Sequence, residues 1–274
     1  MMQLLAEYGG LIVVLAACGL FAGTVAGLFG VGGGAVIVPA LYFAISGLGY
    51  EQTAQHMAVA TSLATIILTS LRSVMAHHKH GAVSWEIIRT WGPWIMLGAV
   101  LGMVLASYLS ATALTLLFGC VAVVVSLQFF FGRPDWKIGE DMPVGVTRGA
   151  LGGGLGGLSA LLGVGGGTFG ASLMTLYGRK IHNAVATGAG FGIAIGLPAT
   201  LAAVITGWSV PGRPPFSLGY VSLPAFFLIS IFTVIMAPVG AKLAHALNAQ
   251  LLRRMFGVLL FLVAIRMIWR VIGG

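Results

Sequence analysis

Long apolar runs separated by short polar stretches dominate the chain. Seven of these runs approach or exceed the roughly 20 residues that a helix needs to cross the hydrocarbon core of a bilayer. They are residues 9–29, 54–76, 85–109, 111–131, 183–206, 219–247 and 249–271. Three shorter apolar segments lie between them, at residues 33–47, 146–162 and 166–178. This pattern predicts an all-α integral membrane protein.

The composition supports a membrane protein and argues against a nucleic-acid-binding one. Of the 274 residues, 58% are hydrophobic and 7% are charged, whereas a soluble domain carries roughly 25% charged residues. The net charge of +8 comes from Lys and Arg scattered among apolar segments, so it reports orientation in the membrane rather than a nucleic acid partner. Cys18 and Cys120 lie within apolar runs, and no spaced Cys/His set accompanies them. We therefore expect neither a metal site nor a cofactor.

Three motifs occur twice in the same order, which indicates two related halves. Gly-Val-Gly-Gly-Gly occupies residues 30–34 and 163–167. His-x-Ala-Val-Ala-Thr occupies residues 56–61 and 182–187, and Phe-Gly occupies 118–119 and 256–257. A polar stretch separates the halves. The predicted organisation is a first membrane repeat at 1–131, a polar cytoplasmic linker at 132–145 and a second membrane repeat at 146–274.

The distribution of basic residues predicts how the chain is oriented. If the chain changes sides after each of the five apolar segments in each half, only Arg213, Arg266 and Arg270 of the 14 Lys and Arg fall on one side. The positive-inside rule then places both termini outside and residues 132–145 in the cytoplasm. The same sides result whether each pair broken at a glycine motif forms two short crossings or a re-entrant hairpin. Either way each half crosses an odd number of times, so the halves are expected to be inverted repeats, as in many secondary transporters.

The glycine motifs are the first candidate binding groups. Three consecutive glycines should break a helix, which a membrane tolerates only inside the protein or beside a cavity. A helix that starts at Gly32, Gly33 and Gly34 leaves its first N–H groups free at its positive dipole end, which suits an anion. Gly165, Gly166 and Gly167 give a second such start in the other half. The alternative is close helix packing through small residues.

Hydroxyl and imidazole side chains extend the candidate site. Thr61 and Thr187 end the repeated His-x-Ala-Val-Ala-Thr motif and could donate to the same anion, unless each bonds its own helix backbone. Ser62 and Thr168 are further candidates without a counterpart in the other half. His56 and His182 could couple transport to protons, or could be interface residues bonded to a loop.

The acidic residues restrict the function further. All six fall in loops or at segment ends, whereas cation carriers and proton relays commonly place Asp or Glu at membrane depth. The deep hydroxyls have no histidine at their own depth, so an intramembrane enzyme with a nucleophile and base is not expected. The residues therefore favour an anion transporter over a cation carrier or an enzyme.

These motifs resemble those of a known family. The first glycine motif followed by Pro39, the second followed by Thr168-Phe169, and both His-x-Ala-Val-Ala-Thr motifs are similar to the sulfite exporter TauE/SafE family over nearly the whole chain. The resemblance implies a multi-pass transporter of the bacterial inner membrane that exports sulfite or a related sulfur-containing or organosulfonate anion. Gly188 stands where the first half has Ser62, so the two sides of the site would be unequal.

Other functions and assemblies remain as alternatives. A passive anion channel, or a carrier of another small anion such as a carboxylate, fits the same residues. The expected partners are the small anion and the lipid bilayer, without nucleic acid, and a homodimer is the oligomer that we consider.

Overall fold

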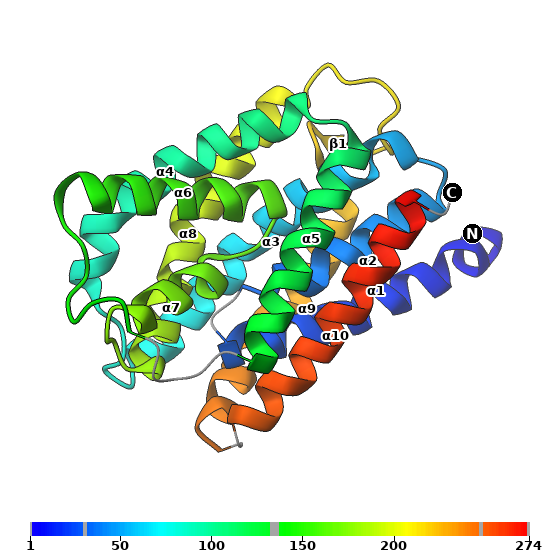
Figure 1. Cartoon of the computed structure of the whole chain (residues 1–274). Helices are drawn as coiled ribbons and strands as arrows, with labels where there is room; N and C mark the ends of the chain where they lie inside the picture. Colours follow the sequence, from blue (N-terminus) through cyan, green and yellow to red (C-terminus); the bar gives the residue numbers. More distant parts are fainter. Residues whose placement is uncertain (1, 30–31, 132–136, 247–248, 273–274) are drawn as a thin grey trace.

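The computed structural model describes residues 2–29, 32–131, 137–246 and 249–272, which form ten helices and one short β-hairpin. The first half contains α1 (Met2–Phe29), α2 (Gly34–Gly47), α3 (Glu51–His78), α4 (Trp85–Tyr108) and α5 (Ala111–Phe131) (Figure 1). The second contains α6 (Gly145–Leu162), α7 (Gly166–Leu176), α8 (Ile181–Thr206), β1 (Ser217–Leu218), β2 (Val221–Ser222), α9 (Leu223–Ala246) and α10 (Ala249–Ile272).

The predicted fold class is confirmed. Within the described residues, six helices are long and apolar enough to span a membrane. Nine of the ten predicted apolar segments coincide with one helix to within four residues at each end, whereas α1 begins at Met2, seven residues before the predicted start. The predicted start of α9 is also wrong, because residues 219–222 belong to the antiparallel hairpin and α9 begins only at Leu223. Gly219 has a φ of +56°, a left-handed conformation that permits the tight turn and excludes a helix there.

The loops gather at two opposite ends of the helix bundle. At one end, Arg270 near the end of α10 forms an ion pair with Glu51 at the start of α3, with N and O 3.1 Å apart. At the other end, the Asn183 amide at the start of α8 donates to the carbonyl of Ala82 between α3 and α4, at 3.2 Å. We call these the Glu51 end and the Ala82 end.

Each pair of helices that is joined at a glycine motif, α1–α2 and α6–α7, folds back as a hairpin. Ile138 N–H donates to the Leu176 carbonyl at 2.8 Å. The start of α6 and the end of α7 therefore both lie at the Ala82 end. α2 ends at Gly47, just before Glu51, and Figure 1 shows the start of α1 on the same side as the end of α10. The pair α1–α2 therefore enters from the Glu51 end.

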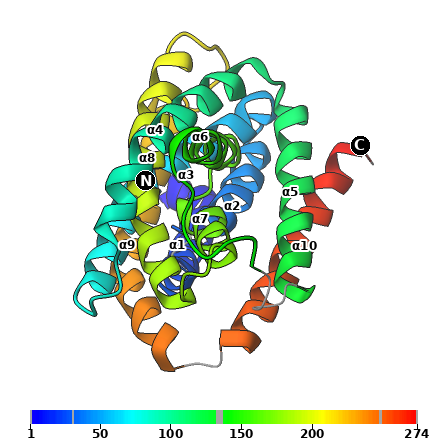
Figure 2. The same ribbon diagram turned by 60° about the vertical axis from the view of Figure 1, so that its left-hand side comes forward.

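The helix pairing is reciprocal between the halves. α1 packs along α9 and α6 along α4, while α3 lies against α8 and α5 against α10. Figure 2 shows α5 and α10 as a layer beside the other helices. A Cβ on Gly27 would overlap the Ala237 carbonyl, and one on Gly98 would overlap the Gly153 carbonyl, so glycines permit both cross-half contacts. The inverted-repeat relation, and the division at 132–145, stay predictions; residues 132–136 lie outside the described residues.

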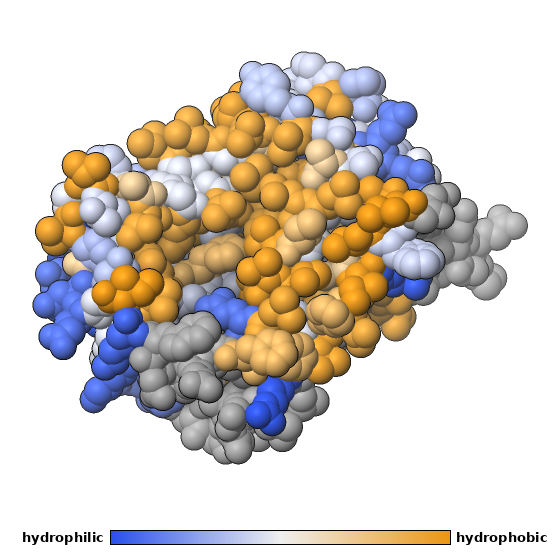
Figure 3. Space-filling view, viewed as in Figure 1, coloured by the Kyte–Doolittle hydropathy of each residue, from blue (hydrophilic) through white to orange (hydrophobic). Residues whose placement is uncertain are grey.

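The outer surface fits a lipid environment. Figure 3 shows a broad hydrophobic face with hydrophilic residues toward its lower left and upper right. Large apolar side chains on several helices are exposed, among them Leu101 at 60% and Val124 at 65%, and a water-soluble monomer rarely exposes so much contiguous apolar surface. The protein is thus a multi-pass membrane protein.

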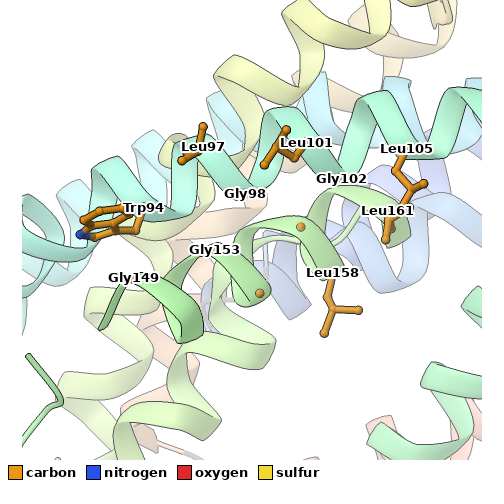
Figure 4. A pocket seen from close by; sticks show the side chains of 12 residues that line it. Trp94, Leu97, Gly98, Leu101, Gly102, Leu105, Gly149, Gly153, Leu158 and Leu161 are labelled. Atoms are coloured by element: carbon orange, nitrogen blue, oxygen red, sulfur yellow. The ribbon is translucent and has the colours of Figure 1, made fainter. Parts of the chain in front are cut away.

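One open groove lies on this apolar surface, between α4 and α6. It encloses about 350 Å³ and is lined only by leucines, glycines and Trp94. Figure 4 shows Leu97, Leu101 and Leu158 along its walls. Apart from the indole N–H of Trp94, the side chains that line the groove offer no hydrogen-bond donor to an anion.

Candidate functional site

The two glycine turns meet inside the bundle. Gly32 and Gly33 have φ angles of +73° and +78°, which glycine adopts at little cost, and α2 starts at Gly34. A Cβ on Gly34 would overlap the carbonyl oxygen of Gly163, and one on Gly32 would lie 3.4 Å from the Cα of Gly165. The turns therefore approach each other backbone to backbone. Residues 30–31 of the first motif lie outside the described residues.

The start of α7 also packs closely on α8. A Cβ on Gly166 would overlap the Cβ of Phe191, and a Cβ on Gly188 would lie 2.9 Å from the Cα of Gly167. Neither α2 nor α7 has a side-chain cap hydrogen-bonded at its N-cap residue, Gly33 or Gly165. Two helix starts with uncapped N–H groups and positive dipole ends thus converge between α3 and α8.

Hydroxyl groups surround the second glycine turn. The buried Ser62 hydroxyl on α3 donates to the carbonyl of Gly163 at 2.8 Å. Thr168, in the first turn of α7, is 9% exposed, and its hydroxyl has no hydrogen-bond partner among the described residues. The same is true of the fully buried Ser159, four residues before Gly163. Sequence reasoning missed Ser159, because nothing in the pattern distinguishes one serine in a helix of small residues.

Thr61 and Thr187 are bonded in matching ways on opposite sides of the bundle. Thr61 Oγ1 accepts the backbone N–H of Ser222 at 2.9 Å, and Thr187 Oγ1 accepts that of Ser84 at 3.0 Å. Each serine directly precedes a helix, α9 or α4, and both threonines are fully buried. Each hydroxyl keeps its own hydrogen for donation. A repeated Val-Ser pair at 83–84 and 221–222 could have indicated these contacts.

The two repeated histidines have different surroundings. His56 is buried, and its Nε2 lies 3.1 Å and 3.0 Å from the carbonyl oxygens of Ala106 and Leu109 at the end of α4. Since carbonyls only accept, Nε2 carries a proton. The ring also stacks on Tyr220 with centroids 5.1 Å apart. His182 is exposed at the start of α8. His56 therefore joins α3 to the end of α4 and to Tyr220.

The β-hairpin covers this part of the Glu51 end. Arg213 donates to the carbonyls of Gly219 at 2.9 Å and of Trp208 at 2.8 Å, which fixes the loop that leads into the hairpin. Burial raises the pKa of the Tyr220 hydroxyl above its usual range, and the positive charge of Arg213 opposes this shift. Tyr220 thus stays neutral over His56 at ordinary pH.

The interior lacks charged side chains as far as the structure describes burial. The buried polar residues there are Ser, Thr, Gln55 and two histidines, without Asp, Glu, Lys or Arg. Arg72 on α3 is exposed. Where the structure describes the chain, no three His, Cys, Asp or Glu side chains lie together as metal ligands would. Donors to an anion at the glycine turns are therefore backbone N–H groups and hydroxyls.

Comparison with known proteins identifies the family. The family model described as sulfite exporter TauE/SafE matches residues 15–267. A probable membrane transporter protein of Haemophilus influenzae is 31% identical over 251 residues, which cover 91% of this chain and 95% of that protein. A probable membrane transporter protein of Methanocaldococcus jannaschii is 24% identical over 260 residues, covering 93% and 94%. No solved structure matches the chain. Because the family match includes both glycine turns and nearly all ten helices, this chain belongs to the sulfite exporter TauE/SafE family of membrane transporters.

Proposed function

We propose that the protein is a secondary transporter that exports sulfite, or a related small sulfur-containing or organosulfonate anion, across a bacterial inner membrane. The observation that carries the proposal is the close approach of the two glycine turns at Gly34 and Gly163, each of which leads into an uncapped helix start, beside the buried and unpartnered hydroxyl of Thr168. The family name supports sulfite, and the proposal extends that name to this chain.

The chemistry of the turns suits a small oxyanion. An anion that enters the bundle loses most of its hydration and needs replacement donors. Backbone N–H groups at helix starts supply them together with a favourable dipole. Such neutral donors also allow release, because no Lys or Arg is buried among the described residues to hold the anion in a permanent ion pair. The membrane transporters of the family support a function in transport rather than in enzymatic catalysis.

The candidate groups around the two glycine turns have different roles in the proposed site. We propose that the N–H groups at Gly32–Gly34 and Gly165–Gly167, with Thr168, contact the anion directly. Ser62 holds the second turn through the Gly163 carbonyl. The free hydrogens of Thr61 and Thr187 are the flanking donors.

Transport by the purified protein in liposomes tests the proposal. Radiolabelled sulfite should enter with saturable kinetics, and unlabelled sulfite inside the vesicles should accelerate this entry by counterflow. Linear flux without saturation would instead identify the alternative, a passive anion channel. If no sulfur anion is transported but a carboxylate shows saturable flux, the protein is the other alternative, a carrier of a different small anion.

A binding screen on the detergent-purified protein gives an independent measurement. Sulfite, sulfate, thiosulfate, sulfoacetate, taurine and simple carboxylates are compared for the rise that each causes in the thermal unfolding temperature. A ligand that binds only the folded protein stabilises it in proportion to RT ln(1 + [L]/Kd). The proposal predicts the largest rise with sulfite or an organosulfonate, and equal or larger rises with carboxylates would contradict it.

A further inference from the structure

A row of polar side chains winds along α3 toward the Ala82 end. Its members recur every fourth residue, a spacing that places each one beside the next in a row inclined to the helix axis. All are buried, with exposures of 4% or less: Thr61, Thr65, Thr69, Ser73 and His77. From Thr61 to Ser73 the row extends about 18 Å, at 1.5 Å per residue. That length is more than half of a hydrocarbon core of about 30 Å.

Buried hydroxyls without partners border this row. Ser70 and Ser73 on α3 and Ser230 on α9 are each at least 96% buried, and their Oγ atoms have no hydrogen-bond partner among the described residues. The Thr69 hydroxyl meets that of Thr233 on α9 at 3.0 Å. Leaving a polar group dry and unpaired costs free energy, so these hydroxyls are better suited to a state in which water or a polar ligand reaches them.

The helix of the second half that corresponds to α3 is α8, and it lacks such a polar row. Its positions that match the row, counted from the repeated His-x-Ala-Val-Ala-Thr motif, are fully buried like the row itself. They are Thr187, Phe191, Ile195, Ala199 and Ala203. Apolar side chains thus fill the equivalent positions after the first. In addition, a Cβ on Gly192 of α8 would overlap Ser70 Oγ, so α8 leaves room for the hydroxyls of α3.

We propose that this polar row, at the junction of α3, α8 and α9, forms the wall of the path along which the anion and its water move between the glycine turns and the Ala82 end. The unpartnered hydroxyls of Ser70, Ser73 and Ser230 donate to a small oxyanion in turn, whereas those of Thr65 and Thr69 donate to carbonyls of their own helix. The absence of buried charge among the described residues lets the anion pass. The identity of the anion in this path rests on the proposed function. The existence of a hydrated path does not depend on which anion passes.

Cysteine accessibility tests the path. Ser73→Cys and Ser70→Cys are made in a background with Cys18→Ala and Cys120→Ala, and Ala199→Cys, at the α8 position that matches Ser73, is the control. The proteins are reconstituted and treated from either side with a membrane-impermeant sulfonatoethyl methanethiosulfonate. We expect both α3 cysteines to react at least tenfold faster than Ala199→Cys, and only from the side that carries the Ala82 end.

The outcomes separate the path from its cargo. If Ser73→Cys and Ser70→Cys, both shown to be folded by size-exclusion chromatography, react no faster than Ala199→Cys, the path is wrong. Reaction that sulfoacetate slows supports the path and the sulfur anion together. Reaction that neither sulfoacetate nor sulfate slows supports the path and counts against the sulfur anion as its cargo.

Discussion

Replacing Gly34 with alanine is the sharpest test of the glycine turns as the anion site. In the structure, a Cβ at this position would overlap the carbonyl oxygen of Gly163 and would lie 2.9 Å from the Cα of Val164. Ordinary contact between carbon atoms is about 3.5–4.0 Å. The two turns must therefore separate by at least about 0.6 Å for the Val164 contact alone, and by more to free the carbonyl.

The expected loss follows from what this separation does to the donors. Overpacking of this kind costs about 1–3 kcal/mol of stability, which a folded membrane protein can survive. A hydrogen bond to a charged group contributes about 1.5–3 kcal/mol. If the displaced turn withdraws one backbone N–H from the anion, affinity should fall roughly tenfold to a hundredfold. Two withdrawn donors would abolish measurable binding.

The assay is the dissociation constant of sulfite for purified variants that elute as the parent protein does. Gly47→Ala is the matched control, because it makes the same change in the same helix and its Cβ would meet nothing within 4 Å. It should bind as the parent does and be slightly more stable, since alanine restricts the unfolded chain. Unchanged affinity in folded Gly34→Ala would show that the anion does not depend on the meeting of the two turns.

Three further predictions concern the neighbouring groups. Thr61→Val should lower the free energy of unfolding by about 1–3 kcal/mol, because the buried N–H of Ser222 loses its acceptor. Thr187→Val should lower it less, because the N–H of Ser84 is only partly buried; in Thr115→Val, whose hydroxyl bonds only its own helix, unfolding in denaturant should change least. His56→Gln or His182→Gln should flatten the pH dependence of flux between about pH 5 and 8 if the imidazole carries protons, and unchanged profiles in both would leave only structural roles. A C-terminal phosphatase fusion should be active and a C-terminal green fluorescent protein fusion dark, because the basic residues place the C-terminus outside; the opposite pair of signals would reverse the orientation.

The sequence predicted the helices well because the bilayer imposes a simple rule. An apolar run of sufficient length forms a helix, since every backbone group must be paired within the segment. Consecutive glycines break that helix, as the separate α6 and α7 confirm. The hairpin at 217–222 escaped this reasoning because its second strand is as apolar as the helix that follows. Its strands are defined by the left-handed Gly219 and by tertiary burial rather than by hydropathy.

The individual site residues were harder to predict for a geometric reason. Neighbouring residues on a helix point about 100° apart, so only the rotation of α3 in the bundle decides whether Thr61 or Ser62 faces the second glycine turn. The structure gives that place to Ser62 and directs Thr61 to the start of α9. The hydroxyl of Thr168 is buried without a hydrogen-bond partner among the described residues. This environment arises from packing between helices, so it leaves no local signal in the sequence.

The differences between the halves bear on how a carrier of this kind works. If the halves are inverted repeats, a strictly symmetric chain would have inward- and outward-open conformations of equal energy. Here, His56 is buried under Tyr220 whereas His182 is exposed. Ser62 ties α3 to the second turn, whereas Gly188 can only pack against it. Such unequal contacts cannot be exchanged between the halves without a change in free energy. If the protein is the carrier that we propose, they bias the two conformations, and the unpaired hydroxyls of Ser70 and Ser73 on α3 favour the one in which water reaches them.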